Sequence, residues 1–225
     1  MSVHVNFLAH IPLLRTLPES VRLAVAARMV RRTLARRAVA LEKGARGQPL
    51  GFVLTGRLQA VDFTLDGREA GLYFVGPGEV YGELATIDGG ENPEFVIAIC
   101  QTEVLEMAAA DARALLLPNP HVAEALARRL AARLREAIAL RSVLALPNPM
   151  QRLSALLVGM SGPAGAIAHV PTHQELAIMI NTTRETVTRI LRLLFDQGIV
   201  QRQGEQLAVL QPERLLALAR GEAGP

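Results

Sequence analysis

The pattern of apolar and polar positions divides the first half of the chain into two stretches of different character. Residues 7–36 carry apolar positions at helical spacing, interrupted by prolines, which predicts short amphipathic helices. Eleven of the 18 glycines then fall within residues 44–90, where they separate apolar runs such as "LGFVLTG", "RLQAVDF" and "EAGLYFV". These runs predict strands joined by tight turns, with a hairpin at "LDGRE", since Asp-Gly suits a type I′ turn. We expect a small antiparallel barrel or sandwich that ends near Met107.

A long helical pattern follows and runs without interruption over residues 121–146. Its apolar positions lie close to a heptad repeat, with Arg133 at one skipped position: Leu126, Leu130, Ala137, Leu140 and Leu144. A helix of this length packs on its own barrel or pairs with a second copy in a coiled coil, and its uninterrupted length favours the dimer. Pro147 and Pro149 then break the helix and predict a hinge before a second small domain.

A helix of the second domain is expected to start with a capping box, because Thr172 and Glu175 form a T-x-x-E pattern. This helix leads into a short turn at Asn181, where a left-handed backbone conformation is often required and Asn tolerates it. A second helix starts at Thr182 or Thr183 and follows the turn directly. Two helices joined in this way predict a helix-turn-helix.

The second helix is strongly amphipathic and runs to about Gln197. Its apolar residues form one stripe at spacings i, i+3, i+4 and i+7: Val187, Ile190, Leu191 and Leu194. Four polar residues share the opposite face: Arg184, Glu185, Thr188 and Arg189. After Gly198, the runs "IVQRQ" and "QLAVL" flank Gly204-Glu205 and predict a hairpin with a type II′ turn. The hairpin completes a winged helix-turn-helix.

Composition limits the function classes. With 225 residues, half of them apolar, and a net charge of only +3, the chain is expected to form two folded domains and not a general polyanion binder. The single cysteine, Cys100, lies in the apolar run "FVIAIC" and is expected to be buried in the core. The N-terminus lacks the features of a signal peptide, and no apolar run reaches the length of a membrane span. We therefore expect a soluble, cytoplasmic protein.

The stretch "TRETVTRILRLLFDQGIV" resembles the recognition helix and wing entry of the cyclic-AMP receptor and fumarate–nitrate regulator (CRP/FNR) superfamily. The stretches "PLLRTLP", "GFVLTGRLQA", "DGRE" and "VGPGEVYGEL" resemble its N-terminal segment and its cyclic-nucleotide-binding barrel, so the resemblance covers nearly the whole chain. It implies an α+β fold with three parts. These are a cyclic-nucleotide-binding-type β-barrel (a double-stranded β-helix) in residues 1–118, a dimerisation helix and hinge in 119–147, and a winged helix-turn-helix DNA-binding domain in 148–225.

The resemblance also assigns DNA contacts, since the second helix of this fold enters the major groove. Arg can grip guanine O6 and N7, and Glu can accept from cytosine N4, so base contacts are expected from Arg184, Glu185 and Arg189. Phosphate contacts that set the register are expected from Thr172, Gln174 and Thr183. The methyl group of Thr188 could touch a thymine, and His173 is either a solvated residue or a further contact. An alternative role for Glu185 is a capping box with Thr182 as the cap.

For the barrel, the resemblance implies a nucleotide loop at "GEL", which is Gly82, Glu83 and Leu84. Backbone amides there suit an anion, and Glu83 could accept a ribose hydroxyl, although relatives that bind no nucleotide keep similar glycines for the turns. The family's Arg-Ser pair that neutralises the cyclic phosphate is replaced by Pro93-Glu94. The hydroxyl pair that clamps adenine aligns with Ala137 and Ile138. Cyclic AMP is therefore not the expected effector.

A guanine-containing cyclic dinucleotide, cyclic di-GMP, is the better candidate. The Glu94 carboxylate repels a phosphate but can accept from guanine N1–H and its amine, and some cyclic di-GMP-responsive members resemble this chain in a Glu near that position. Arg133 could then meet a phosphate or stack on a base. An iron–sulfur cluster is not expected with one cysteine, whereas haem stays open through the histidines, each otherwise an isolated surface residue: His4, His10 and His121. A barrel that binds nothing is the alternative.

The leading interpretation is a homodimeric transcription regulator whose barrel gates DNA binding. The resemblance implies a palindromic double-stranded site with TGA-like half-sites, and RNA polymerase as a partner. Alternatives are a ligand-independent regulator controlled by its abundance and a nucleotide-sensing module that acts on a protein partner. The sensing module would leave the Arg-Glu-Thr-Arg face unexplained. An enzyme is disfavoured, because the sequence contains no nucleophile–base pair, metal-ligand cluster or P-loop.

Overall fold

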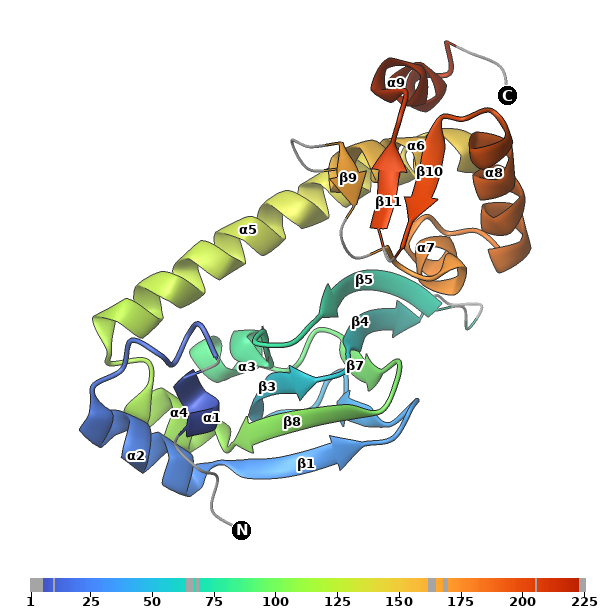
Figure 1. The fold of residues 1–225 in the computed structure, drawn as a ribbon. Coiled ribbons are helices and arrows are strands. Elements are labelled where there is room, and N and C mark those ends of the chain that lie inside the picture. The colour runs from blue at the N-terminus through green and yellow to red at the C-terminus, as the bar shows by residue number, and fades with distance from the viewer. Residues whose placement is uncertain are drawn as a thin grey trace. The chain divides into compact units, whose positions relative to one another are not determined.

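The computed structural model describes residues 6–9, 11–63, 67, 69–161, 165–167, 170–204 and 206–222. The chain divides into two compact units, Met1–Ala132 and Arg133–Pro225, and Figure 1 traces the elements of both. Among the helices of the described residues, none is long and apolar enough to cross a membrane.

The first unit is built on two four-stranded antiparallel sheets, ordered β1-β8-β3-β6 and β2-β7-β4-β5. The strands are β1 (Val30–Leu34), β2 (Val39–Leu41), β3 (Leu50–Thr55), β4 (Leu58–Phe63), β5 (Glu69–Val75), β6 (Val80–Tyr81), β7 (Phe95–Ala98) and β8 (Thr102–Met107). The helices around them are α1 (Asn6–Ala9), α2 (Glu19–Arg28), α3 (Glu83–Asp88) and α4 (Ala109–Leu115). The predicted antiparallel β domain ending at Met107 is confirmed, as a pair of sheets that do not close into one hydrogen-bonded barrel among the described strands.

Two features of this unit differ from the sequence prediction. Val30–Leu34 is the edge strand β1 and not part of a helix, because it pairs with β8 along its whole length. Its two arginines extend that pairing through ion pairs: Arg31 with Glu103 at 2.6 Å and Arg32 with Glu106 at 2.7 Å. Cys100 is exposed and not buried, because β7 ends at Ala98 and the cysteine lies in the turn before β8.

Among the described residues, the interior of the first unit contains two apolar clusters and several buried polar side chains, of which Tyr81 and Glu106 form a bonded pair. One cluster lies between the sheets and includes Val53, Val96 and Val104; the other joins the N-terminal helices and α4 to β3 and β8. Tyr81 is fully buried, and its hydroxyl donates to Glu106 Oε1 at 2.8 Å. A Cβ atom on Gly51 would overlap the Tyr81 ring, so glycine at this position makes room for the tyrosine.

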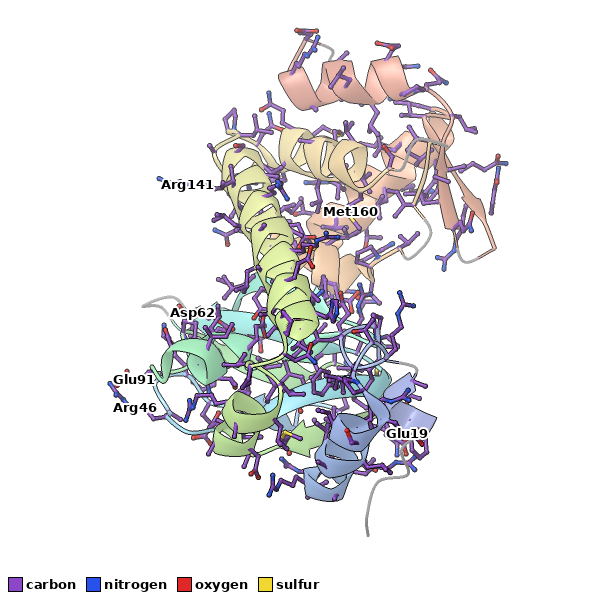
Figure 2. All side chains as sticks on the ribbon, turned by 90° about the vertical axis from the view of Figure 1, so that its left-hand side faces the viewer. Glu19, Arg46, Asp62, Glu91, Arg141 and Met160 are labelled. Carbon is purple, nitrogen blue, oxygen red and sulfur yellow. The ribbon has the colours of Figure 1, made fainter. Side chains whose placement is uncertain are left out.

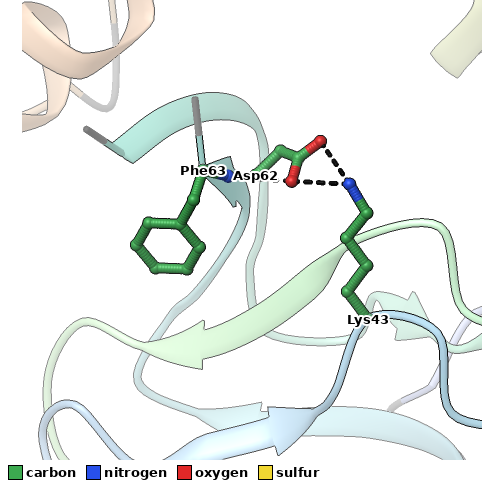
Figure 3. A network of polar contacts seen from close by, with 3 residues as sticks. All are labelled: Lys43, Asp62 and Phe63. Atoms are coloured by element: carbon green, nitrogen blue, oxygen red, sulfur yellow. Dashed lines mark hydrogen bonds and ion pairs between the residues drawn. The ribbon is translucent and has the colours of Figure 1, made fainter. Parts of the chain in front are cut away.

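Surface ion pairs link loops to the sheets of the first unit. Lys43 Nζ donates to both carboxylate oxygens of Asp62 at 2.7 Å, and Asp62 Oδ1 also accepts from the backbone N–H of Phe63 (Figure 3). The hydrogen bond from Lys43 lowers the pKa of Asp62 below its usual value. Figure 2 shows a second pair, Arg46 with Glu91, on the surface of this unit. Strands β4 and β5 pair as the predicted hairpin, while most of its turn, at 64–66 and 68, lies outside the described residues.

The long helix is confirmed as α5 (Pro120–Leu144), but its exposed apolar positions differ from the predicted seam. Leu126 is buried at 4% exposure and packs into the core of the first unit. The most exposed apolar side chains of α5 are instead Leu134 at 63% and Ile138 at 59%, one turn apart on one face. Of the other predicted seam residues, Ala137 and Leu144 are exposed, whereas Leu130 and Leu140 are partly buried. Arg141, labelled in Figure 2, also points away from the helix axis into solvent.

The second unit contains the predicted winged helix-turn-helix. Its elements after α5 are α6 (Pro149–Met160), β9 (Ala166–Ile167), α7 (His173–Met179), α8 (Arg184–Asp196), β10 (Val200–Gln203), β11 (Gln206–Val209) and α9 (Pro212–Arg220). Asn148 caps α6 by accepting from Gln151 N at 2.9 Å, which starts a new helix directly after the proline break. β10 and β11 form the predicted hairpin, and β9 adds a third strand beside β11 (Figure 1). Glu205 lies outside the described residues, so the turn type stays a prediction.

Candidate nucleic-acid interface

The first helix of the pair, α7, starts as its sequence predicts. Thr172 Oγ1 accepts from Glu175 N at 3.3 Å, and Glu175 Oε2 accepts from Thr172 N at 2.6 Å, so both halves of the capping box are formed. Asn181 has a φ of 50° and takes the left-handed conformation expected of it in the turn. These local features set where α8 begins.

The start of α8 excludes one of the two roles predicted for Glu185, the role in a capping box. Thr183 is the cap, since its Oγ1 accepts from Thr186 N at 3.2 Å. The residue three positions after this cap is Thr186 and not Glu185, so the alternative capping box with Thr182 is wrong. Its physical reason is the one-residue shift of the helix start. Glu185 is exposed and stays available for an external partner.

The amphipathic division of α8 is confirmed. Its apolar stripe is buried in the core of the second unit: Val187, Ile190, Leu191 and Leu194. A hollow of about 450 Å³ lies over the opposite face, lined by Arg184, Glu185, Thr188, Arg189 and Arg192. Within the described part of the chain, no hydrogen bond or ion pair engages the side chains of Arg184, Glu185 or Arg189. Buried apolar contacts therefore hold the helix while its charged face stays open.

Thr188 is the member of this face that is fixed by neighbours. Its hydroxyl donates to the Arg184 carbonyl oxygen at 2.9 Å, and His173 Nδ1 lies 2.8 Å from the same Oγ1. Burial lowers the pKa of His173, and the guanidinium groups of Arg184 and Arg202 lower it further. The half-buried histidine thus joins the start of α7 to the exposed face of α8.

The other predicted contacts surround this face. Thr172 and Gln174 are exposed at the start of α7, whereas the Thr183 oxygen is engaged in the cap of α8. The sequence analysis did not single out Arg192 and Arg202. Arg192 could have been found, because it follows Arg189 by three positions on the same helix face. Arg202 could not, since only the fold brings the β10 strand close enough for its charge to act on His173.

The residues predicted to bind a ligand lie in two units. Gly82 has a φ of 78° and precedes α3, and its carbonyl oxygen accepts from Thr86 N and Thr86 Oγ1. Glu83 is buried and Leu84 is exposed. Glu94 is 8% exposed, directly before β7, and accepts from Tyr73 Oη at 2.6 Å. Arg133 is on the part of α5 that belongs to the second unit.

This arrangement tests the fit of a cyclic nucleotide. The family resemblance implies that position 94 lies where the phosphate of cyclic AMP would bind, and a buried carboxylate there would repel that phosphate. A separate cavity of about 560 Å³ has Pro12, Glu79, His121 and Arg129 among its lining residues, and none of the residues predicted to bind a nucleotide is among those described there. His4 and His10 lie outside the described residues.

Comparison with known proteins covers both units. Residues 31–119 match the cyclic nucleotide-binding domain family, and residues 151–218 match the Crp-like helix-turn-helix domain family. The cyclic AMP receptor protein of Thermus thermophilus is 36% identical over 160 residues, which are 71% of this chain and 74% of that protein. The crystal structure of the Thermus thermophilus catabolite activator protein is 31% identical, covers 94% of this chain and 100% of its own, and superposes with a TM-score of 0.50. The structure of FixK2 from Bradyrhizobium japonicum shares the fold, with a TM-score of 0.70 at 23% identity over 88% of this chain and 98% of its own.

Proposed function

Because the chain belongs to the CRP/FNR family of transcription regulators, we propose that it acts as a homodimer that reads a palindromic DNA site through α8. Members of this family are regulators and not enzymes, and this chain has their two domains. The observation that supports the proposed reading most directly is the exposed face of α8, whose Arg184, Glu185 and Arg189 side chains have no partner among the described residues. Three charged side chains kept unpaired on a rigid helix are suited to an external partner.

The chemistry of this face fits the major groove. Each Arg can donate two hydrogen bonds to guanine O6 and N7, and the Glu185 carboxylate can accept from cytosine N4. Residues of this kind suit a TGA-like half-site, which pairs with a strand that offers cytosine. A two-fold dimer would place two such half-sites about one helical turn apart, at roughly 34–36 Å. Thr172 and Gln174, exposed beside the face, are the proposed phosphate contacts that set its register.

The proposed dimer pairs α5 with its copy. Leu134 and Ile138 supply the support, because two large apolar side chains more than half exposed on one helix face gain by burial. Replacing both with Glu should give monomers in sedimentation analysis that bind DNA weakly. A variant with the same two charges at Arg128 and Arg135, also exposed on α5, is the control and should stay dimeric.

Two possibilities for the barrel are considered, a nucleotide effector and no ligand, and one observation supports each. The Thermus relative is named a cyclic AMP receptor, yet this chain has a buried Glu94 where the resemblance implies the phosphate of that nucleotide, and a carboxylate there would repel it. We therefore propose that cyclic AMP is not the effector and that cyclic di-GMP, whose guanine can donate to a carboxylate, is the better candidate. The bond from Tyr73 to Glu94 favours the second possibility, a barrel that needs no ligand, since that carboxylate already has a donor.

Calorimetric titration of the full chain with each nucleotide separates these states. Cyclic di-GMP binding that disappears in Glu94→Ser supports a gated regulator, and tight binding of cyclic AMP contradicts the proposal. If neither nucleotide binds while DNA does, control by protein abundance is favoured. RNA polymerase is the proposed protein partner, and the proposed location is the cytoplasm, where a regulator meets the chromosome.

Selection from random double-stranded DNA tests the central proposal. We expect palindromes with TGA-like half-sites to be enriched by the full chain. Glu185→Ala should relax selection at one base pair of each half-site, at a cost of about 1–3 kcal/mol on the preferred sequence. Arg220→Ala, an exposed change at the end of α9, is the matched control and should leave the selected sequence unchanged. A chain that enriches no sequence would refute the proposal.

A further inference from the structure

The hydrogen bonds of Thr188 favour one tautomer of the histidine beside it. A threonine hydroxyl carries one hydrogen, and that hydrogen goes to the Arg184 carbonyl oxygen at 2.9 Å. The 2.8 Å contact with His173 can then form only if Nδ1 carries a hydrogen and donates it to Thr188 Oγ1. The remaining ring nitrogen, Nε2, is therefore the atom of His173 that gains or loses a proton.

The same bonds fix what Thr188 can present to DNA. Its hydroxyl donates its one hydrogen to the Arg184 carbonyl oxygen and accepts from His173 with one of its two lone pairs, so it cannot donate a hydrogen bond to a base. The side chain is exposed, and its methyl group makes none of these bonds and is available on the reading face. A methyl group held in one orientation can contact the methyl group of thymine.

Two cations bear on His173 from the elements packed around it. Arg184 comes from α8 and Arg202 from β10, while Glu175 on its own helix is bound in the capping box. Together with burial, these guanidinium groups disfavour the charged imidazole in the free protein and lower its pKa. Phosphates of bound DNA would instead favour the charged imidazole, because they neutralise the two arginines and add negative charge beside the ring.

We propose that His173 is a positioning residue of the reading face, which holds Thr188 through Nδ1 and takes up one proton at Nε2 when DNA binds. The inference rests on the proposed DNA-reading function and adds a specific role to it. The proton comes from solvent, and the Nδ1–H···Oγ1 bond is unchanged in both charge states because Nδ1 donates in each. The charged ring presents Nε2–H as a donor to phosphate, whereas the neutral ring presents a lone pair.

The sign of the linkage follows from the two states. The bound state has the higher pKa, so DNA affinity is greater at low pH and falls as pH rises between the free and bound pKa values of His173. Since the free value lies below the usual 6.5, we expect the fall to extend from below pH 6.5 upward. The maximum slope is about tenfold in affinity per pH unit for each subunit.

Three substitutions separate positioning from protonation. His173→Asn keeps an N–H in place of Nδ1–H but cannot become charged. His173→Ala removes both functions, and His121→Asn, at an exposed histidine of the other unit, is the matched control. Fluorescence anisotropy of the full chain on its selected site is measured from pH 5.5 to 8. We expect the steep dependence in wild type and His121→Asn, and a flatter one in His173→Asn and His173→Ala.

Removing one thymine methyl group from the DNA tests whether His173 positions Thr188. Replacing thymine by deoxyuridine removes only its methyl group, and we expect wild-type affinity to fall about fourfold at one position of each half-site. Thr188→Ser and His173→Ala should lose this discrimination, whereas His173→Asn should keep it. Nitrogen NMR shifts of the free protein should also show His173 with its hydrogen on Nδ1.

The outcomes distinguish this inference from the proposed function. Specific DNA binding with the same pH slope in wild type and His173→Asn would overturn the inference alone. A hydrogen on Nε2 instead of Nδ1 in the free protein would also overturn it, without any reference to DNA. Absence of sequence-specific binding at every pH would remove the proposed function and the inference together.

Discussion

One charged group in each unit of this chain shows an opposite environment. On the exposed face of α8, Arg184, Glu185 and Arg189 have no partner among the described residues. In the first unit, Glu106 is 6% exposed and accepts from both Tyr81 and Arg32. The α8 face contributes little to its own fold, whereas the Glu106 group is part of the interior of the sheets.

This difference separates residues that hold the fold from residues kept for a partner. A buried carboxylate is stable only when its donors are present, so removing it or its donors destabilises the unit. An exposed unpaired charge can be removed with little change in stability, and its loss is seen in binding. Substitutions at the α8 face should therefore change DNA binding, and substitutions at Glu106 should change the free energy of unfolding.

The largest effect is expected at Gly51, where a side chain has no room. The Cβ atom of Gly51→Ala would overlap the buried Tyr81 ring, so the ring or the paired strands β3 and β6 must shift and the hydrogen bond from Tyr81 to Glu106 is disturbed. We expect a loss of about 3 kcal/mol or more in the free energy of unfolding of the first unit, measured by urea denaturation of the full chain. Gly159→Ala in α6, where a Cβ meets open space, is the control and should be neutral or slightly stabilising. Equal stability of the two variants would show that the sheets yield without cost.

A smaller loss is expected from Glu106→Ala on β8. The buried Tyr81 hydroxyl would lose its acceptor, which costs about 1–3 kcal/mol in unfolding free energy. Glu103→Ala is a close control, because Glu103 lies on the same strand and pairs with the neighbouring Arg31, but on the exposed side. We expect that control to lose about 1 kcal/mol or less. Similar losses in both variants would contradict the distinction between buried and exposed charge.

The amount that sequence could predict also differs between these regions. The buried stripe and polar face of α8 follow from a period of 3.6 residues within one helix, so local sequence is sufficient. The same holds for the capping box at Thr172 and for the glycine-bounded strands β3 to β5. Each depends on residues that are near one another in the chain.

The incorrect or missing predictions depend on residues far apart. Val30–Leu34 has no apolar alternation, because it is an edge strand whose arginines pair with carboxylates more than 70 positions away. Cys100 was expected in the core from its apolar neighbours, although the strand ends two residues before it. The link from His173 to Thr188 joins two helices across 15 positions, and no periodicity signals it. Tertiary contacts decide all three.

Arg189 is expected to matter for DNA affinity and not for stability. Arg189→Ala should leave the free energy of unfolding within about 0.5 kcal/mol of wild type, since its side chain has no partner among the described residues. It should weaken binding to the selected DNA site by about 1–3 kcal/mol, because one bidentate guanine contact is lost. Anisotropy titration at fixed salt measures the affinity, and Arg135→Ala on α5 is an exposed arginine control. A stability loss as large as that of Glu106→Ala would mean that this face also supports the fold.

The smallest effect on stability is expected at Lys43 and Asp62, because these two exposed side chains already bind each other. Lys43→Met removes the donor to both Asp62 oxygens, but both side chains are well exposed, so the melting temperature at pH 7 should fall only slightly. The hydrogen bond from Lys43 keeps the pKa of Asp62 low in the folded chain. The pair therefore stabilises the folded chain fully at pH values above the usual aspartate pKa of about 3.9. This stabilisation is lost as pH falls through the lowered value, because the carboxylate is then protonated in both states. The difference between wild type and Lys43→Met should therefore shrink in acid, and Arg46→Met, which breaks the more exposed pair with Glu91, should show a smaller difference at either pH. A difference that grows in acid would mean that Lys43 stabilises the first unit through contacts other than Asp62.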